Sequence, residues 1–197
     1  MNEQADTYQR IIESAQELMH ASSYSDVGVA AICAKAKVKK GSFYHFFPSK
    51  QDLTLAVIDK NAADMKVSLI DQAFNSALAP LERLQCFIDL TIEMQTTIHQ
   101  QTGHVYGCPF GNLATEMSTQ DEDIRRKLDK SFASLYGIFS TTLQEAVDNN
   151  ELDKINNVDA TAQAMLAYLE GTMLLAKTQN DPNLLKQLLP AALQIRL

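Results

Sequence analysis

The chain has 197 residues, of which 46% are hydrophobic and 21% charged, and its formal net charge is −7. This composition supplies enough apolar material for a sizeable core and excludes intrinsic disorder. No apolar run approaches the ~18 residues that a membrane-spanning helix needs, and the first ten residues are polar where a secretory signal is apolar. We therefore expect a cytoplasmic protein with no membrane partner.

The three cysteines, Cys33, Cys86 and Cys108, are odd in number and widely spaced. This pattern fits neither a disulfide framework nor a zinc site with paired ligands, so we expect free thiols in a reducing compartment. Cys33 and Cys86 fall on predicted apolar helix faces, where a thiol is buried and unreactive.

Charge is divided unevenly along the chain. Residues 1–60 hold seven basic and seven acidic side chains, so residues 61–197 carry the whole net charge of −7. Five lysines and no acidic residue lie between Lys35 and Lys50. A solvated helix face accounts for such a run as readily as a nucleic-acid site does, unless the surrounding pattern favours one of them.

The first fifty residues carry the pattern of three helices. In the first helix, the apolar residues that recur on one face are Ile11, Ile12, Ala15, Leu18 and Met19. A short helix capped by Asp26 is expected to reach Ala34, and another to run from Val38 to Phe46. Pro48 ends the latter, because the residue before a proline disfavours helix. Two short helices joined by a tight turn and packed on a longer one form a helix-turn-helix.

Capping signals predict helices through the rest of the chain. Ser49 followed by Asp52 opens a long helix that reaches about Phe74, and Thr119 with Glu122 opens another. The remaining helices are expected at about residues 80–102, 109–117, 158–179 and from 184 onward. Because no strand pattern occurs, the predicted fold class is all-α, with about nine or ten helices.

The helix predicted at residues 158–179 is apolar almost all round, which indicates burial on several sides. A single domain of this size rarely buries one helix so fully. We therefore expect this helix and the terminal one to meet their copies in a homodimer, since a two-fold contact is the commonest way to cover such a surface.

Residues 38–50 read V-K-K-G-S-F-Y-H-F-F-P-S-K, and I-C-A-K-A-K precedes them. This stretch resembles the DNA-binding domain of TetR-family repressors, whose motif is close to I-A-x-x-A-G-V-x-K-G-[ST]-[FL]-Y-x-[YH]-F-x-S-K-x-x-L. The resemblance covers about residues 7–60. It implies a helix-turn-helix DNA-binding domain over residues 1–48 and a C-terminal helical bundle over residues 49–197 that senses a ligand and dimerises. The helix that starts at Ser49 would link the two.

The second short helix has the chemistry of a helix that enters a major groove. Gly41 and Ser42 give it little bulk at its start, while lysine and tyrosine side chains reach phosphates or base edges. Lys50 lies in the first turn of the next helix, where the helix dipole also attracts a phosphate. Phe43 and Phe47 are expected in the core. The residues expected at DNA are Lys39, Lys40, Gly41, Ser42, Tyr44, His45 and Lys50.

Three positions depart from the family pattern. Lys37 stands where the family has a turn glycine, so the left-handed conformation usual there is either strained or replaced by another turn. Val27 stands where a threonine is usual, and Lys39 replaces a small polar residue. Base preference therefore cannot be carried over from the family.

Residues 107–116 read G-C-P-F-G-N-L-A-T-E and resemble the segment G-C-x-x-G-N-L-A-x-E of a subset of TetR-type regulators. Residues 170–177, E-G-T-M-L-L-A-K, resemble a segment that accompanies it. Some members of that subset respond to electrophiles or oxidants, which implies that Cys108 is a thiol sensor. A thiol at a helix N-terminus is biased toward thiolate, more so if Lys177 or His104 approaches it.

A structural role for Cys108 is equally open. In that case a small-molecule inducer binds without covalent chemistry in a pocket lined by Phe87, Met94, Phe110 and Met173. Both alternatives predict a homodimer that binds palindromic double-stranded operator DNA and leaves it when the inducer acts.

Other classes of function fit the sequence less well. The four histidines lack metal-ligand spacing, and there is no glycine-rich phosphate loop or nucleophile elbow, so we expect no enzyme activity, cofactor or metal. A DNA-packaging protein or a helical interaction module would account for helices and lysines. Neither accounts for the acidic remainder, because packaging proteins gain affinity from broad positive charge.

Overall fold

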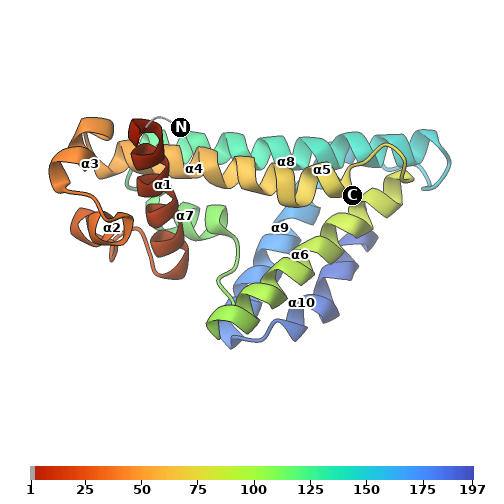
Figure 1. The fold of residues 1–197 in the computed structure, drawn as a ribbon. Helices are drawn as coiled ribbons and strands as arrows, with labels where there is room; N and C mark the ends of the chain where they lie inside the picture. The colour runs from red at the N-terminus through yellow and green to blue at the C-terminus, as the bar shows by residue number, and fades with distance from the viewer. Residues whose placement is uncertain (1–2) are drawn as a thin grey trace. The chain divides into compact units, whose positions relative to one another are not determined.

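The computed structural model describes residues 3–197 and the side chains from Gln4 onward (Figure 1). This range is helical, with no β-strand among its residues, which confirms the predicted all-α class. The elements are α1 (Glu3–Ala21), α2 (Val29–Ala36), α3 (Lys40–Phe46), α4 (Lys50–Met65), a π-helical segment η1 (Lys66–Ile70), α5 (Asp71–Ala73), α6 (Pro80–Thr102), α7 (Pro109–Met117), α8 (Glu122–Asp148), α9 (Val158–Gln179), α10 (Asn183–Leu188) and a 3-10 segment η2 (Leu189–Gln194).

These helices form two compact units. The N-terminal unit comprises the described residues up to Asp64 together with Pro109–Asp129, and the C-terminal unit comprises Met65–Cys108 and Lys130–Leu197. Helix α7 and the first turns of α8 therefore belong with the N-terminal helices, although they are distant in sequence. The functional limits 1–48 and 49–197 stay a prediction.

The core of the N-terminal unit forms where the apolar faces of its first four helices meet. Phe43 is fully buried and Phe47 is 3% exposed, which confirms their predicted place in the core. The ring of Tyr8 stacks on that of Phe47, with 5.0 Å between centroids. The buried residues of this cluster are Ile11, Ile12, Ala15, Val27, Ile32, Cys33, Ala36, Phe43, Phe47, Leu53 and Val57.

Of the three predicted helix caps, one is confirmed and two are wrong. Ser49 caps α4 as predicted, since its Oγ accepts a hydrogen bond from the amide of Asp52 at 3.1 Å. The predicted cap by Asp26 is wrong: α2 begins after Gly28, because residues 22–28 form a loop whose Val27 side chain is buried. The predicted cap by Thr119 is also wrong, because the turn that follows α7 continues through that residue.

Asp121 takes the place predicted for Thr119. Its Oδ1 accepts hydrogen bonds from the amides of Asp123 at 3.1 Å and Ile124 at 3.0 Å, at the start of α8. A carboxylate in this position satisfies amides that lack helical partners and lies favourably in the helix dipole.

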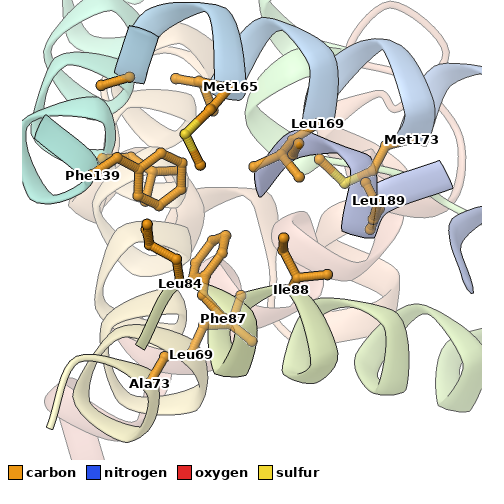
Figure 2. Packing of buried hydrophobic residues seen from close by; sticks show 14 of the residues in the cluster. Leu69, Ala73, Leu84, Phe87, Ile88, Phe139, Met165, Leu169, Met173 and Leu189 are labelled. Carbon is orange, nitrogen blue, oxygen red and sulfur yellow. The ribbon is translucent and has the colours of Figure 1, made fainter. Parts of the chain in front are cut away.

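The C-terminal unit packs α6, α8, α9 and the last helices around a second core. Figure 2 shows side chains of α9, among them Met165 and Leu169, pointing toward Leu84 and Ile88 of α6. Phe139 of α8 closes one end of this layer, where its ring lies edge-on to Phe87 of α6 with 5.2 Å between centroids. Aromatic pairs in this geometry are stabilising beyond the area they bury.

Helix α9 is buried along much of its length but not all round. Met165, Leu169 and Met173 lie in the core, whereas Leu174 is 63% exposed and Leu175 is 50% exposed. Two neighbouring leucines exposed on the same helix mark an apolar surface. Within residues 3–197, no helix combines the length and the hydrophobicity needed to cross a membrane.

Candidate DNA interface and sensor segment

The turn between α2 and α3 keeps the left-handed conformation without a glycine. Lys37 has φ 56° and ψ 45°, and its amide bonds to the carbonyl of Ala34 at 3.2 Å. The amide of Val38 reaches the carbonyl of Cys33 at 3.0 Å, so the turn closes as a Schellman motif. Of the two outcomes expected at Lys37, the left-handed conformation is the one observed, and a residue with a Cβ is disfavoured in it.

Helix α3 has one buried face and one open face. Phe43 is fully buried beneath it, while Lys40, Gly41, Tyr44 and His45 are exposed. A Cβ at Gly41 would meet nothing within 4 Å, so the fold itself does not require glycine there. The open face therefore has little bulk at Gly41 and carries polar side chains on either side of it, which suits close approach to a partner surface.

Beside this face lies a hollow of about 390 Å³. Its lining residues are Gln4, Thr7, Gly41, Ser42, His45 and Phe46. Because α1 and α3 both contribute to it, the arrangement of these two helices shapes the surface next to the open face.

The lysines near α3 differ in their partners. Lys35 forms an ion pair with Glu17 of α1 at 2.6 Å, whereas no acidic residue that the structure describes pairs with Lys39 or Lys40. These two exposed ammonium groups make the start of α3 cationic, although the whole chain is acidic. A local cationic surface of this kind attracts phosphate.

Lys50 is engaged within the chain. Its Nζ donates a hydrogen bond to the carbonyl of Tyr24 and lies 3.9 Å from the centroid of the Tyr24 ring. Burial lowers the pKa of Lys50, while the charges of Glu116 and Asp26 act in the opposite direction. Its predicted contact with a DNA phosphate stays a prediction.

Glu116 of α7 holds the loop between α1 and α2. Its two carboxylate oxygens accept hydrogen bonds from the amides of Tyr24 at 2.8 Å and Ser25 at 2.7 Å. Burial acts to raise the pKa of Glu116, but the hydrogen bonds from Ser25 and Tyr24 and the charge of Lys50 outweigh it and lower the pKa. In the sequence, Glu116 is only the last residue of the sensor segment at residues 107–116. Sequence analysis therefore did not predict its contact with the loop.

Cys108 stands where the chain leaves the C-terminal unit for α7. It is half-buried, and its side chain is hydrogen-bonded to Glu170 of α9. Burial raises the pKa of Glu170, and the bond with Cys108 acts against that rise. The preceding Gly107 is held by the side chain of Gln95, which accepts from its amide at 3.2 Å and donates to its carbonyl at 3.1 Å.

The predicted pocket residues divide between the two units. Phe87 and Met173 lie in the core cluster of the C-terminal unit, and Met94 and Cys108 pack against that cluster. Phe110 is buried in the N-terminal unit. The pocket itself stays a prediction.

The cations predicted beside Cys108 lie in different surroundings. His104 is exposed, and its ring stacks on that of Tyr106 with 6.5 Å between centroids. Lys177 is half-buried, and burial lowers its pKa. Their approach to Cys108 stays a prediction.

The other two thiols differ in their exposure. Cys33 is buried and burial raises its pKa, as expected of an unreactive thiol, while Cys86 is half-buried. In the part of the chain that the structure describes, no three His, Cys, Asp or Glu side chains are grouped to hold a metal ion.

A helix-turn-helix with an exposed cationic second helix, followed by a larger helical unit, defines a DNA-binding transcriptional regulator. Residues 11–57 match the family model for bacterial regulatory proteins of the tetR family, and residues 80–192 match the model for the tetracyclin repressor-like C-terminal domain. The chain belongs to the TetR family of transcriptional regulators, as its motifs predicted, and these proteins are not enzymes.

Two characterised relatives cover most of the chain. The transcriptional regulator AcuR of Cereibacter sphaeroides is 36% identical over 185 residues, which are 89% of this chain and 78% of AcuR. The transcriptional repressor NemR of Escherichia coli K12 is 25% identical over 174 residues, which are 87% of this chain and 84% of NemR.

Solved structures show the same fold. A regulatory protein TetR from Rhodobacter sphaeroides aligns with a TM-score of 0.85 and 32% identity, over 97% of this chain and 99% of the other. The reduced form of E. coli NemR aligns with a TM-score of 0.85 and 24% identity, over 98% and 97% of the two chains.

Proposed function

We propose that this regulator is a repressor that binds a palindromic operator as a homodimer and leaves it when a small molecule or a thiol-modifying electrophile acts near Cys108. Operator binding is supported by the open face of α3. There Lys39, Lys40 and Tyr44 are exposed, while the phenylalanines beneath them are buried. Repression, as opposed to activation, is supported by the similarity to NemR, which is itself a repressor.

Operator binding places α3 in the major groove. Gly41 and Ser42 let the backbone approach the bases, while Lys39 and Lys40 bind phosphates or base edges and position the helix. A two-fold dimer presents two such helices ~34 Å apart, one turn of DNA, so each contacts one half of an inverted repeat. Tyr44 and His45 extend the contact surface, and Lys50 adds a phosphate contact.

The exposed leucines of α9 support dimer formation. Leu174 and Leu175 are large, apolar and at least half exposed, on a helix that also carries the buried residues Met165, Leu169 and Met173. Covering them with the same surface of a second copy removes apolar area from water, which stabilises the assembly.

The position of Cys108 supports the sensor. A maleimide adds to its sulfur across the C=C bond, and the thiol proton ends on the neighbouring ring carbon, so no oxidant is required. The added bulk enters a half-buried site and removes the hydrogen bond to Glu170. The chain relaxes by displacing α7 and the long helix after Ser49, which changes the spacing of the two α3 helices and releases DNA.

The alternative is an inducer that binds without covalent chemistry. Two observations support it: Cys108 packs against the cluster that contains Phe87 and Met173, and its hydrogen bond to Glu170 holds the thiol in place. Cys108 is then structural, and a small molecule acts by occupying a pocket beside it.

A gel-shift titration separates the two alternatives. The operator is first obtained by selection from random duplexes, and an inverted repeat is expected. N-ethylmaleimide should release the wild-type protein, whereas Cys108→Ser should bind the operator normally and resist release. Cys86→Ser, which alters another half-buried thiol of the C-terminal unit, is the matched control and should respond like wild type. Normal release of Cys108→Ser would refute the thiol sensor and leave the non-covalent inducer.

The same assay distinguishes a regulator from a packaging protein. A regulator keeps an affinity for its operator that is ~10³-fold or more above that for random DNA at physiological salt. A ratio near one, with a steep salt dependence on both DNAs, would refute the proposal of a specific operator.

A further inference from the structure

Glu116 of α7 contacts the loop between α1 and α2 through both of its carboxylate oxygens. One carboxylate oxygen accepts from the amide of Tyr24 at 2.8 Å and the other from the amide of Ser25 at 2.7 Å. The carboxylate therefore grips two successive peptide groups, and Glu116 is more than ninety positions away in the sequence.

Lys50 completes this contact from the other side. Its ammonium group donates to the carbonyl of Tyr24 and lies over the Tyr24 ring. Tyr24 is thus held at its amide by Glu116 and at its carbonyl and ring by Lys50. We call the contacts among Glu116, Tyr24, Ser25 and Lys50 the Glu116 clamp. The two opposite charges stabilise each other where both are partly removed from water.

The Glu116 clamp joins three elements that matter for DNA binding. The gripped loop leads directly to Gly28, where α2 begins without a side-chain cap. Lys50 is the first residue of α4, which follows α3 in the sequence. Neighbouring contacts reinforce the attachment: Gln51 of α4 donates to Asp121 at 3.1 Å, and Lys127 of α8 pairs with Asp59 at 2.6 Å.

We propose that Glu116 is the positioning residue that holds the helix-turn-helix in its operator-competent arrangement, and that a change at Cys108 acts on DNA through it. The second half rests on the proposed function. Glu116 lies about two helical turns beyond Cys108 along α7. Displacement of α7 withdraws the carboxylate from Tyr24 and Ser25 and removes the countercharge of Lys50, so the loop before α2 loses its anchor.

Electrostatics and the positioning role predict opposite effects of Glu116→Gln on operator affinity. The change removes a negative charge from the unit that binds DNA, so electrostatics alone predicts tighter binding. The glutamine amide accepts from one of the two loop amides but presents a donor to the other. If Glu116 positions the helices, Glu116→Gln should weaken operator binding about tenfold to hundredfold while affinity for random DNA stays equal or rises.

Glu122→Gln is the matched control. Glu122 is an exposed residue of the same unit, and its ion pairs with Arg125 and Arg126 lie within α8. The variant carries the same charge change without touching the loop. It should bind the operator as tightly as wild type or more tightly.

A second variant keeps the carboxylate charge and changes only the length of the side chain. Glu116→Asp is one methylene shorter and cannot grip both amides, so its operator affinity should also fall. It serves the test if Glu116→Gln does not fold, which circular dichroism reports. Hydrogen exchange should show faster exchange of the Tyr24 and Ser25 amides in either variant.

The possible results separate the two halves of the proposal. Wild-type operator affinity in both Glu116 variants would overturn the positioning role. If N-ethylmaleimide lowers the operator affinity of wild type and of Glu116→Gln by the same factor, transmission through Glu116 is overturned. If N-ethylmaleimide releases neither protein but Glu116→Gln still loses operator affinity, the thiol sensor fails and the positioning role stands.

Discussion

The turn at Lys37 should lower the stability of the folded protein, because a residue with a Cβ stands where a glycine fits better. Lys37 occupies the left-handed region with φ 56° and ψ 45°, and its side chain is exposed. A non-glycine residue in this region costs ~1–2 kcal/mol, because Cβ crowds the following carbonyl. Lys37→Gly removes that cost but adds ~0.5–1 kcal/mol of conformational entropy to the unfolded chain. The net change should raise the free energy of unfolding by ~0.5–1 kcal/mol.

The matched control is Lys37→Ala, which removes the same exposed side chain and keeps Cβ. The hydrogen bonds of the turn, from Lys37 to Ala34 and from Val38 to Cys33, are made by the backbone and are available to both variants. Urea unfolding followed by circular dichroism measures the difference, and a gain of 1 kcal/mol corresponds to a rise in Tm of ~2–4 °C for a chain of this size. A glycine variant no more stable than the alanine variant would refute the reasoning about strain.

Glu116, the leucine pair of α9 and Gln95 should each respond measurably to substitution. Because the pKa of Glu116 is lowered on folding, the stability it contributes is complete above its ordinary value of about 4.5 and is lost as the pH falls through the lower folded value. Urea unfolding between pH 3 and 6 should therefore show a flatter pH dependence in Glu116→Gln than in wild type, and equal slopes would contradict this. Leu174→Glu combined with Leu175→Glu should give monomers in analytical ultracentrifugation and weaken operator binding; an intact dimer would place the interface elsewhere. Gln95→Leu removes the two hydrogen bonds that the buried Gln95 side chain makes with the amide and carbonyl of Gly107 and should lower the free energy of unfolding by ~2 kcal/mol; an unchanged free energy of unfolding would contradict this.

Local signals in the sequence predicted the helices well, because helical periodicity and the Ser49 cap depend on residues within a few positions of each other. The two wrong caps show where local signals fail. Asp26 and Thr119 both have good capping chemistry, but the chain forms a loop at one and continues a turn at the other. Cap choice follows the path of the backbone, and that path is set by packing as well as by propensity.

The residues proposed to contact DNA could be grouped from the sequence because they are contiguous. Gly41, Ser42 and Tyr44 lie on one short helix, so a motif and a helical period suffice to place them together. Lys50 shows the limit of that approach. Its place at a helix start indicated a phosphate contact, whereas its partners in the fold, Tyr24 and Glu116, come from segments that no local pattern connects.

The amino-acid order alone determined that this is an all-helical TetR-family regulator whose helix-turn-helix has a cationic second helix, since these features arise from neighbours along the chain. Tertiary structure decided that α7 belongs to the N-terminal unit and that Glu116 grips the loop before α2. The reason is physical: a hydrogen bond between residues so far apart in sequence forms only after the packing of several helices has brought donor and acceptor together, and no pairwise rule of spacing encodes that packing.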